Sequence, residues 1–175
     1  AALLPVAPAQ ATFAGSNGKV AFVSSGLRLM VDDPYDDAPA TGIASSAGAS
    51  PGTAPVSAPS WAPDGVRIAY AEAVADAPAT DHSAIFTIDW NGQGRAQVSS
   101  PYPVHVDTCT PACKDGEETY DTAPAFSPDG TQVAFIRVVA ADEHAAHVSL
   151  LGTSIWVADA RGGAERLLVH TDPKS

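Results

Sequence analysis

Short alternating runs of hydrophobic residues recur along this chain, and one run occurs twice in nearly the same form. The segments SAPSWAPDGVRIAYA (57–71) and DTAPAFSPDGTQVAFI (121–136) share an aromatic residue, a Pro-Asp-Gly triplet and an apolar tail. After each triplet, apolar side chains stand two residues apart, which is the period of a β-strand. The pattern therefore predicts a strand, a tight turn and a second strand in both places.

The Pro-Asp-Gly triplets carry the chemistry of a turn. Proline presets φ for the second turn position, aspartate tolerates the third position, and glycine takes the positive φ that follows. The residues concerned are Pro63, Asp64 and Gly65 in one copy and Pro128, Asp129 and Gly130 in the other. Because these aspartates recur in register, we interpret them as structural turn residues and not as catalytic groups.

The similarity continues beyond the turns. SAIFTIDWNGQGRAQVS (83–99) matches TSIWVADARGGAERLLV (153–169), and a weaker copy, SNGKVAFVSS then LRLMVDD, lies within 16–33. Each full copy reads as strand, turn, strand, loop, strand, glycine turn and strand, which predicts a four-stranded antiparallel meander. One such sheet cannot bury both faces alone, so the units must stack, as in a β-propeller. The expected fold is an all-β propeller with about three blades present.

The repeated run resembles a known family. The pattern (W/F)-(S/A)-P-D-G-x-x-(I/V)-A-(F/Y), followed by I-(F/W)-x-x-D, is similar to the WD-like repeat of TolB-type β-propellers, weakly over 16–33 and well over 57–169. The resemblance implies a binding platform, a periplasmic accessory protein or the non-catalytic domain of a peptidase. Asp64 and Asp129 stand 65 positions apart, where a simple blade needs roughly 40–45, so inserts are expected.

The units divide the chain. We expect blades at about 16–33 (partial), 57–100 and 122–170, a low-complexity loop at 34–56 and an insert at 101–121. Three units do not close a ring, which typically takes four to eight blades. The propeller is therefore expected to be incomplete, and to be closed by further chain or by a partner.

The first residues have the composition of an export signal. AALLPVAPAQA (1–11) is apolar and ends in an A-x-A pattern, which is typical of a signal-peptide remnant. The alternative is an Ala/Pro-rich leader without defined structure. We expect an exported protein, periplasmic or extracellular, with no integral membrane segment, since no run approaches 18 apolar residues.

The net charge of −11 limits the choice of partners. It argues against nucleic acid and against anionic membrane surfaces, both of which need Lys and Arg. Acidic residues cluster at 31–37, 114–121 and 141–144. Solvated loops explain these clusters better than a calcium site, because none has the spacing of a calcium-binding loop. No cofactor is expected.

Cys109 and Cys113 are the only cysteines. In an exported chain this Cys-x3-Cys pair favours a local disulfide. The alternative is a metal site with His105 as a third ligand, which would still lack a fourth.

No catalytic constellation has its required context. Residues 48–52, GASPG, match G-x-S-x-G, but no apolar strand precedes them and no helix follows. His144 and His147 have a chelating spacing without a third ligand. We therefore expect a non-enzyme. The alternative is the propeller part of a longer exported serine peptidase, whose hydrolase domain is absent here.

The acidic insert is the expected binding loop, because propeller blades present their long loops on a rigid scaffold. The expected partner is another protein or a component of the cell envelope. The candidate binding residues are Tyr102, His105, Asp107, Asp115, Glu117, Glu118 and Tyr120.

Overall fold

The computed structural model describes residues 18–24, 28–45, 56–74, 82–100, 117–142 and 148–171 of the 175-residue chain. These residues form eleven strands and no helix, which confirms the prediction of an all-β fold. The strands are β1 (Val20–Val23), β2 (Arg28–Asp32), β3 (Thr41–Ser45), β4 (Ser57–Trp61), β5 (Arg67–Val74), β6 (His82–Asp89), β7 (Ala96–Gln97), β8 (Glu117–Phe126), β9 (Gln132–Asp142), β10 (Val148–Asp159) and β11 (Arg166–Thr171).

Hydrogen bonding groups these strands into three antiparallel meanders. Strands β1, β2 and β3 form one sheet, and a second sheet has the order β11-β10-β9-β8-β6-β5-β4, with β7 paired to β6. Only one parallel pair, Ser83 with Tyr120, joins β6 to β8, so the second sheet consists of two four-stranded meanders. We call β1–β3 the first unit, β4–β7 the second unit and β8–β11 the third unit. The described strands do not close into a barrel or ring.

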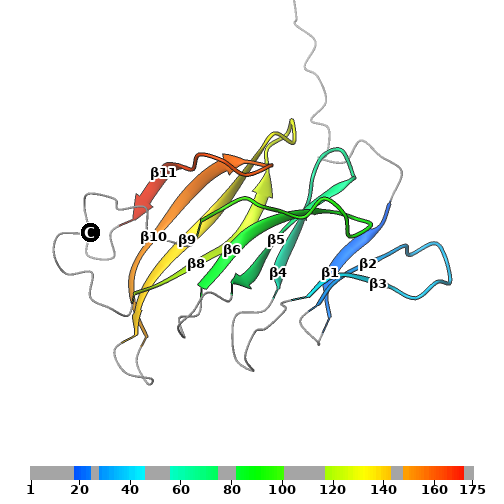
Figure 1. The fold of residues 1–175 in the computed structure, drawn as a ribbon, viewed down its shortest axis with the longest axis horizontal. Helices are drawn as coiled ribbons and strands as arrows, with labels where there is room; N and C mark the ends of the chain where they lie inside the picture. The colour runs from blue at the N-terminus through cyan, green and yellow to red at the C-terminus, as the bar shows by residue number, and fades with distance from the viewer. Residues whose placement is uncertain are drawn as a thin grey trace, which may run out of the picture.

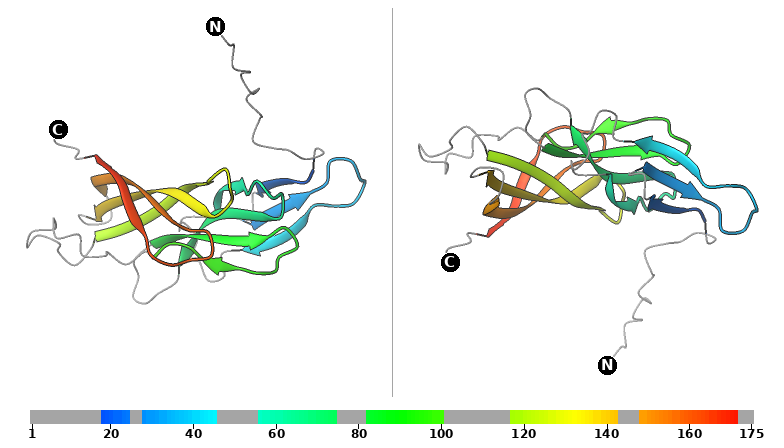
Figure 2. Two further views of the ribbon diagram at one scale, coloured as in Figure 1. Left: turned by 90° about the horizontal axis from the view of Figure 1, so that it is seen from above. Right: turned by 90° about the horizontal axis from the view of Figure 1, so that it is seen from below.

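The second unit lies between the other two, as Figure 1 shows and the views of Figure 2 repeat. Both of its faces are buried, because alternate residues of a strand point to opposite sides. We call the face toward the first unit the leading face and the face toward the third unit the trailing face. The leading face packs Ile68, Tyr70, Ala84, Phe86 and Ile88 against Leu29 and Val31. The trailing face packs Ala69, Ala71 and Ile85 against Val133, Phe135, Trp156 and Ala158.

The two Pro-Asp-Gly triplets form matching turns between β4 and β5 and between β8 and β9. Gly65 N donates to Ala62 O at 3.0 Å, and Gly130 N donates to Ser127 O at 2.9 Å. The two glycines have the positive φ that the turn chemistry predicts, 68° and 70°. The turns therefore set the same register within each unit, between β4 and β5 in the second unit and between β8 and β9 in the third.

A second repeated feature lies just before each turn. Ala58 and Ala123 have φ of 48° and 50°, values that residues other than glycine seldom adopt. Each stands at a break in strand register, between Ser57 and Ser60 in one unit and between Thr122 and Ala125 in the other. Both alanines precede a proline, so the Ala-Pro step marks a β-bulge in each unit.

Two boundaries differ from the sequence-based expectation. Residues 41–45, expected within a low-complexity loop, form β3, which pairs with β2 and packs Ile43 and Ala44 against the core beside the second unit. Residues 117–121, expected within the insert, belong to β8, which begins at Glu117 and pairs with β9. Residues 1–11 lie outside the described residues. No helix in the described part of the chain is long and apolar enough to cross a membrane.

Candidate functional site

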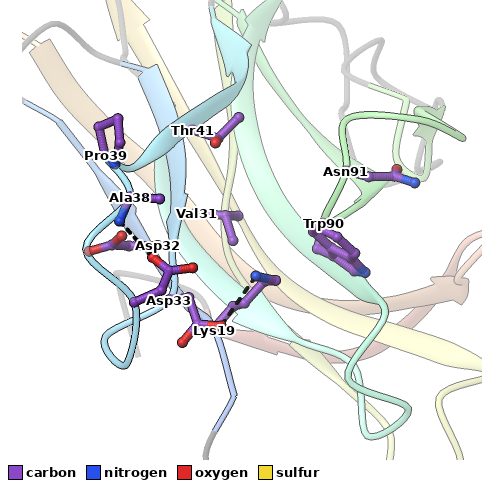
Figure 3. Close-up of a pocket in the computed structure, with 10 residues that line it drawn as sticks. Lys19, Val31, Asp32, Asp33, Ala38, Pro39, Thr41, Trp90 and Asn91 are labelled. Carbon is purple, nitrogen blue, oxygen red and sulfur yellow. Dashed lines mark hydrogen bonds and ion pairs between the residues drawn. The ribbon is translucent and has the colours of Figure 1, made fainter.

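A groove of about 250 Å³ opens between the first and second units. One wall is the loop between β2 and β3, and the other is the turn that follows β6 (Figure 3). The residues that shape it include Lys19, Val31, Asp33, Asp36, Trp90 and Asn91. Aromatic, cationic and acidic side chains meet at this groove.

The Trp90 side chain forms the aromatic side of the groove and is 40% exposed. Lys19 Nζ lies 4.8 Å from the centre of the Trp90 ring and 3.5 Å from Asp33 Oδ2. An ammonium group over an indole face is a favourable contact, worth about 0.5–1 kcal/mol at an exposed site. Lys19 thus joins the loop of the first unit to the turn of the second (Figure 3).

Local hydrogen bonds fix both walls. In the β2–β3 loop, Asp33 Oδ1 accepts from Tyr35 N at 3.1 Å and Asp36 Oδ1 accepts from Ala38 N at 3.0 Å. Short aspartate side chains favour such turns because they replace a backbone acceptor. In the opposite wall, Trp90 N donates to Val66 O at 2.9 Å. The backbone on both sides of the groove is therefore held before any ligand binds.

The groove carries an excess of negative charge. Asp32, Asp33 and Asp36 line it, and Lys19 is the only cation among the described residues that line it. An exposed tryptophan beside carboxylates suits a cationic or amphipathic segment of a protein partner, since both the ring face and the acids attract positive charge.

An ion pair between the half-exposed Arg95 and the buried Glu72 lies on the leading face of the second unit. Arg95 Nη2 lies 3.0 Å from Glu72 Oε2, and Arg95 Nε donates to Tyr70 Oη at 3.3 Å. The guanidinium stacks 3.9 Å from the centre of the Phe86 ring. Burial, followed by the charge of Glu72, raises the pKa of Tyr70. This phenol therefore stays neutral and serves as a packing and hydrogen-bonding group.

A larger ion network lies on the leading face of the third unit. Arg137 donates to both carboxylate oxygens of Asp121 at 2.7 Å and to Ser100 O at 2.8 Å. Its Nη1 also forms an ion pair with Glu165 Oε2 at 2.9 Å, but the two groups are not aligned for a hydrogen bond. Ser100 N donates to the other oxygen of Glu165. Burial raises the pKa of Asp121, against the opposing effect of Arg137. The network joins the end of the second unit to the third.

The turn aspartates have lowered pKa values. Hydrogen bonds from Ser127 Oγ and from the Thr131 backbone and hydroxyl lower the pKa of Asp129 to about 2. For Asp64, partial burial raises the pKa, but hydrogen bonds from Val66 N and Arg67 N, with the Arg67 charge, outweigh it and lower the pKa. Both carboxylates accept bonds within their own turns, as structural groups do.

Most of the residues proposed from sequence for binding fall outside the described part of the chain. These are Tyr102, His105, Asp107 and Asp115. The possible disulfide residues Cys109 and Cys113, the GASPG run at 48–52, and His144 and His147 also lie outside it. Glu117, Glu118 and Tyr120 lie in β8, and Tyr120 is half-buried. The structure thus places the last three in a sheet and not in a free loop.

The groove is a feature that sequence reasoning missed. The acidic run at 31–37 was noted, but as solvated loops or a calcium site, and Trp90 was not separated from the strand before it. In the described part of the chain, no group of three or more His, Cys, Asp or Glu side chains is arranged to hold a metal ion. The signal that could have located the groove is the contrast between Trp90 and Ala160, which occupy the same repeat position.

Comparison with known proteins adds no assignment, because no family model matches the chain and no curated protein matches it.

Proposed function

We propose that this chain supplies blades of a TolB-like β-propeller and acts outside the cytoplasm as a non-catalytic binding module. The observation that carries the proposal is the stack of three antiparallel meanders, whose second member is buried on both faces. Propeller blades pack in this face-to-face manner and leave their turns and loops free for ligands.

We further propose that the groove beside Trp90 is the binding site, and that its ligand is a segment of another protein or of a cell-envelope component. Tryptophan is enriched among the residues that dominate protein interfaces. The carboxylates around it favour a segment that carries Lys or Arg. The walls of the groove are fixed by backbone hydrogen bonds, so little ordering would be needed on binding.

The pattern of perturbed ionisable groups favours binding over catalysis. Catalytic groups tend to combine a shifted pKa with a position in a cleft. Here the shifted groups are bonded inside the unit interfaces, as Tyr70 and Asp121 are, or within turns, as Asp64 and Asp129 are. None of these four lines the groove.

The test is a comparison of two variants at the same end of the molecule. The full chain, Trp90→Ala and Val66→Ala would each be immobilised and exposed to an extract of exported proteins from the source cells. Val66 is a matched control because it is exposed, apolar and next to Trp90 but does not line the groove. We expect one defined protein to bind the full chain and Val66→Ala and to be lost with Trp90→Ala. Equal capture by all three would refute the groove as the site.

A second variant separates the groove from the acidic insert. Replacing residues 105–116 with a Gly/Ser linker leaves β8 intact, because that strand begins at Glu117. If the groove is the site, this variant keeps the partner that Trp90→Ala loses. Loss with the linker variant and retention with Trp90→Ala would move the site to the insert.

A further inference from the structure

The ammonium group of Lys19 occupies a position in the groove that suits a cation. Its Nζ lies 4.8 Å from the centre of the Trp90 ring and 3.5 Å from Asp33 Oδ2 (Figure 3). An aromatic face and a carboxylate are the two kinds of group by which proteins bind ammonium ligands. The chain thus fills this position with a side chain of its own.

The contacts of Lys19 are loose. Its distance to the Asp33 oxygen, 3.5 Å, exceeds the roughly 2.7–2.9 Å that is usual for a charge-assisted hydrogen bond. The two side chains are 33% and 32% exposed, so water competes with their attraction. Lys19 also stands directly before β1, whose pairing with β2 begins at Val20. Its side chain can therefore leave the groove without disturbing that pairing.

A comparable cation at the same unit interface is held more tightly. Arg95 Nη2 lies 3.0 Å from Glu72 Oε2, and the guanidinium lies 3.9 Å from the centre of the Phe86 ring. The Glu72 side chain is 8% exposed, against 32% for Asp33. Burial closes Glu72 to a cation from solution, whereas Asp33 stays open to one. Of these two cations, Lys19 is the one that a ligand can displace.

The charge and size of the groove favour a basic side chain as the ligand. Asp32, Asp33 and Asp36 line it, and the single positive charge of Lys19 leaves an excess of negative charge. Its volume of about 250 Å³ is below the roughly 300–1,000 Å³ of typical sites for free small molecules. The groove therefore fits a side chain of a bound segment better than a separate small ligand.

The loop aspartates favour lysine over arginine. Asp33 Oδ1 accepts from Tyr35 N, and Asp36 Oδ1 accepts from Ala38 N, so one oxygen of each carboxylate is bound within the loop. A guanidinium binds best through two parallel hydrogen bonds to one carboxylate, whereas an ammonium needs a single oxygen. Asp33 holds Lys19 in this way, through Oδ2.

We propose that Lys19 is a displaceable internal ligand, and that the external ligand is a lysine side chain of a partner segment. On binding, the ammonium of the partner replaces that of Lys19 against Trp90 and Asp33, and the Lys19 ammonium moves into solvent. The groove is thus occupied by its own chain before binding, which lowers the affinity for every cationic ligand. This inference rests on the groove being the binding site, as proposed above.

The first test measures binding of the peptide acetyl-Gly-Lys-Gly-Lys-Gly-amide to the full chain by isothermal titration calorimetry. Lys19→Met removes the ammonium and keeps an unbranched side chain, so this variant should bind the peptide about fivefold more tightly than the parent chain. Circular dichroism would verify that the variant keeps its strands. Equal affinity of the parent chain and Lys19→Met would overturn the proposal.

Arg28→Met is the matched control for charge. It removes one positive charge from the same unit, but Arg28 does not line the groove, so its affinity for the peptide should equal that of the parent chain. An equal gain in Arg28→Met and Lys19→Met would mean that net charge and not displacement raises the affinity, and would overturn the proposal.

Two further peptides test the class of ligand. In one, arginine replaces both lysines, and in the other norleucine does, which keeps an apolar side chain without the charge. Lys19→Met should bind the lysine peptide more tightly than the arginine peptide and should not bind the norleucine peptide. Tighter binding of either substitute would overturn lysine as the ligand.

The indole N–H resonance of Trp90 reports where the peptide ammonium lies. Lys19→Met should shift this resonance, and the lysine peptide should shift it back toward its position in the parent chain, because one ammonium replaces another over the ring. The spectrum of Trp90→Ala identifies the resonance. Binding that leaves the shifted resonance in place would overturn displacement.

Partner capture separates this inference from the proposed function. Lys19→Met should capture more of the partner than the parent chain does. If capture depends on Trp90 but the lysine peptide binds no variant, the internal-ligand proposal is wrong and the groove remains the binding site. If capture does not depend on Trp90, the groove is not the site and both proposals fail.

Discussion

The interface between the first and second units and that between the second and third use the same backbone arrangement with opposite charges. Glu72 in β5 pairs with Arg95, while at the same repeat positions Arg137 in β9 pairs with Glu165. The acid and the base have exchanged places. The arrangement of strands therefore fixes where an ion pair lies but not its polarity.

The surroundings of the two pairs decide how much each contributes. Arg95 is 48% exposed, so water competes for it. Arg137 is 6% exposed and also binds the fully buried Asp121. Pairs near water contribute little, whereas breaking a buried pair leaves a charge without solvent or partner.

The turn end of the two interfaces differs in packing. Ala160 is buried and its carbonyl accepts from Thr87 Oγ1 at 3.0 Å, which ties the turn of the third unit to the second. Trp90 holds the same repeat position in the second unit, and there the groove opens beside Val31. One interface is thus sealed at this end and the other keeps a hollow. The candidate site therefore lies where the second unit has Trp90 in place of the alanine found in the third unit.

The largest effect is expected from Arg137→Met. This variant leaves Asp121 and Glu165 buried without their cation, and we expect a loss of about 3–5 kcal/mol of unfolding free energy in urea. Arg95→Met, at the half-exposed pair, should cost only about 1 kcal/mol. Equal losses would show that burial does not distinguish the two pairs.

The next effect concerns the turn glycines. Gly162→Ala places a Cβ 2.5 Å from the Gln97 carbonyl oxygen and retains a φ of 86°. We expect a loss of about 2–3 kcal/mol, against about 1 kcal/mol for Gly92→Ala, which has similar φ but a nearest contact at 3.6 Å. Thermal unfolding of both variants measures the difference, and identical values would argue against close packing of the third unit's turn on β7.

A smaller effect is expected from reversing the second unit's pair. Glu72→Arg and Arg95→Glu should each destabilise, and the double variant should regain about 1 kcal/mol relative to the sum of the single losses. This would give the second unit the polarity found in the third. A double-mutant cycle in urea provides the coupling energy. A coupling energy of zero would mean that the choice of acid and base at these two positions depends on other neighbouring residues and not on the paired side chain.

The smallest effect is a pH dependence in the turn of the third unit. The pKa of Asp129 falls from 3.8 to about 2 on folding, so its contribution is present above pH 4 and is lost as the pH drops toward 2. Asp129→Asn should therefore show a smaller fall in Tm between pH 4 and pH 2 than the parent chain. An unchanged fall would assign the acid sensitivity to other carboxylates.

Much of the fold could be predicted from the sequence because its signals are local. The Pro-Asp-Gly triplets predicted two turns, and the alternation after them predicted β5 and β9. The bulges at Ala58 and Ala123 were missed, since an alanine with positive φ has no strong local signature. β3 was missed because TGIAS lies in a low-complexity segment, has no clear alternation of apolar and polar residues, and becomes a strand by pairing with β2.

The candidate site was less predictable because it depends on contacts between units. Lys19, Asp33 and Trp90 come from different strands and turns and meet only after the first two units stack. The Arg137 network likewise requires two units. Alternation within one strand carries no information on which distant side chain will lie opposite.

Hydrogen exchange across the three units tests the central claim, that the second unit is enclosed between its neighbours. Amides of β5 and β6 are expected to exchange most slowly, at the rate of global unfolding, because both faces of these strands are buried. Amides of β1 and β11, in the two units that have only one neighbour among the described units, should exchange much faster. If β5 and β6 exchange as fast as β1 and β11, the second unit is not enclosed and the stacked arrangement is wrong.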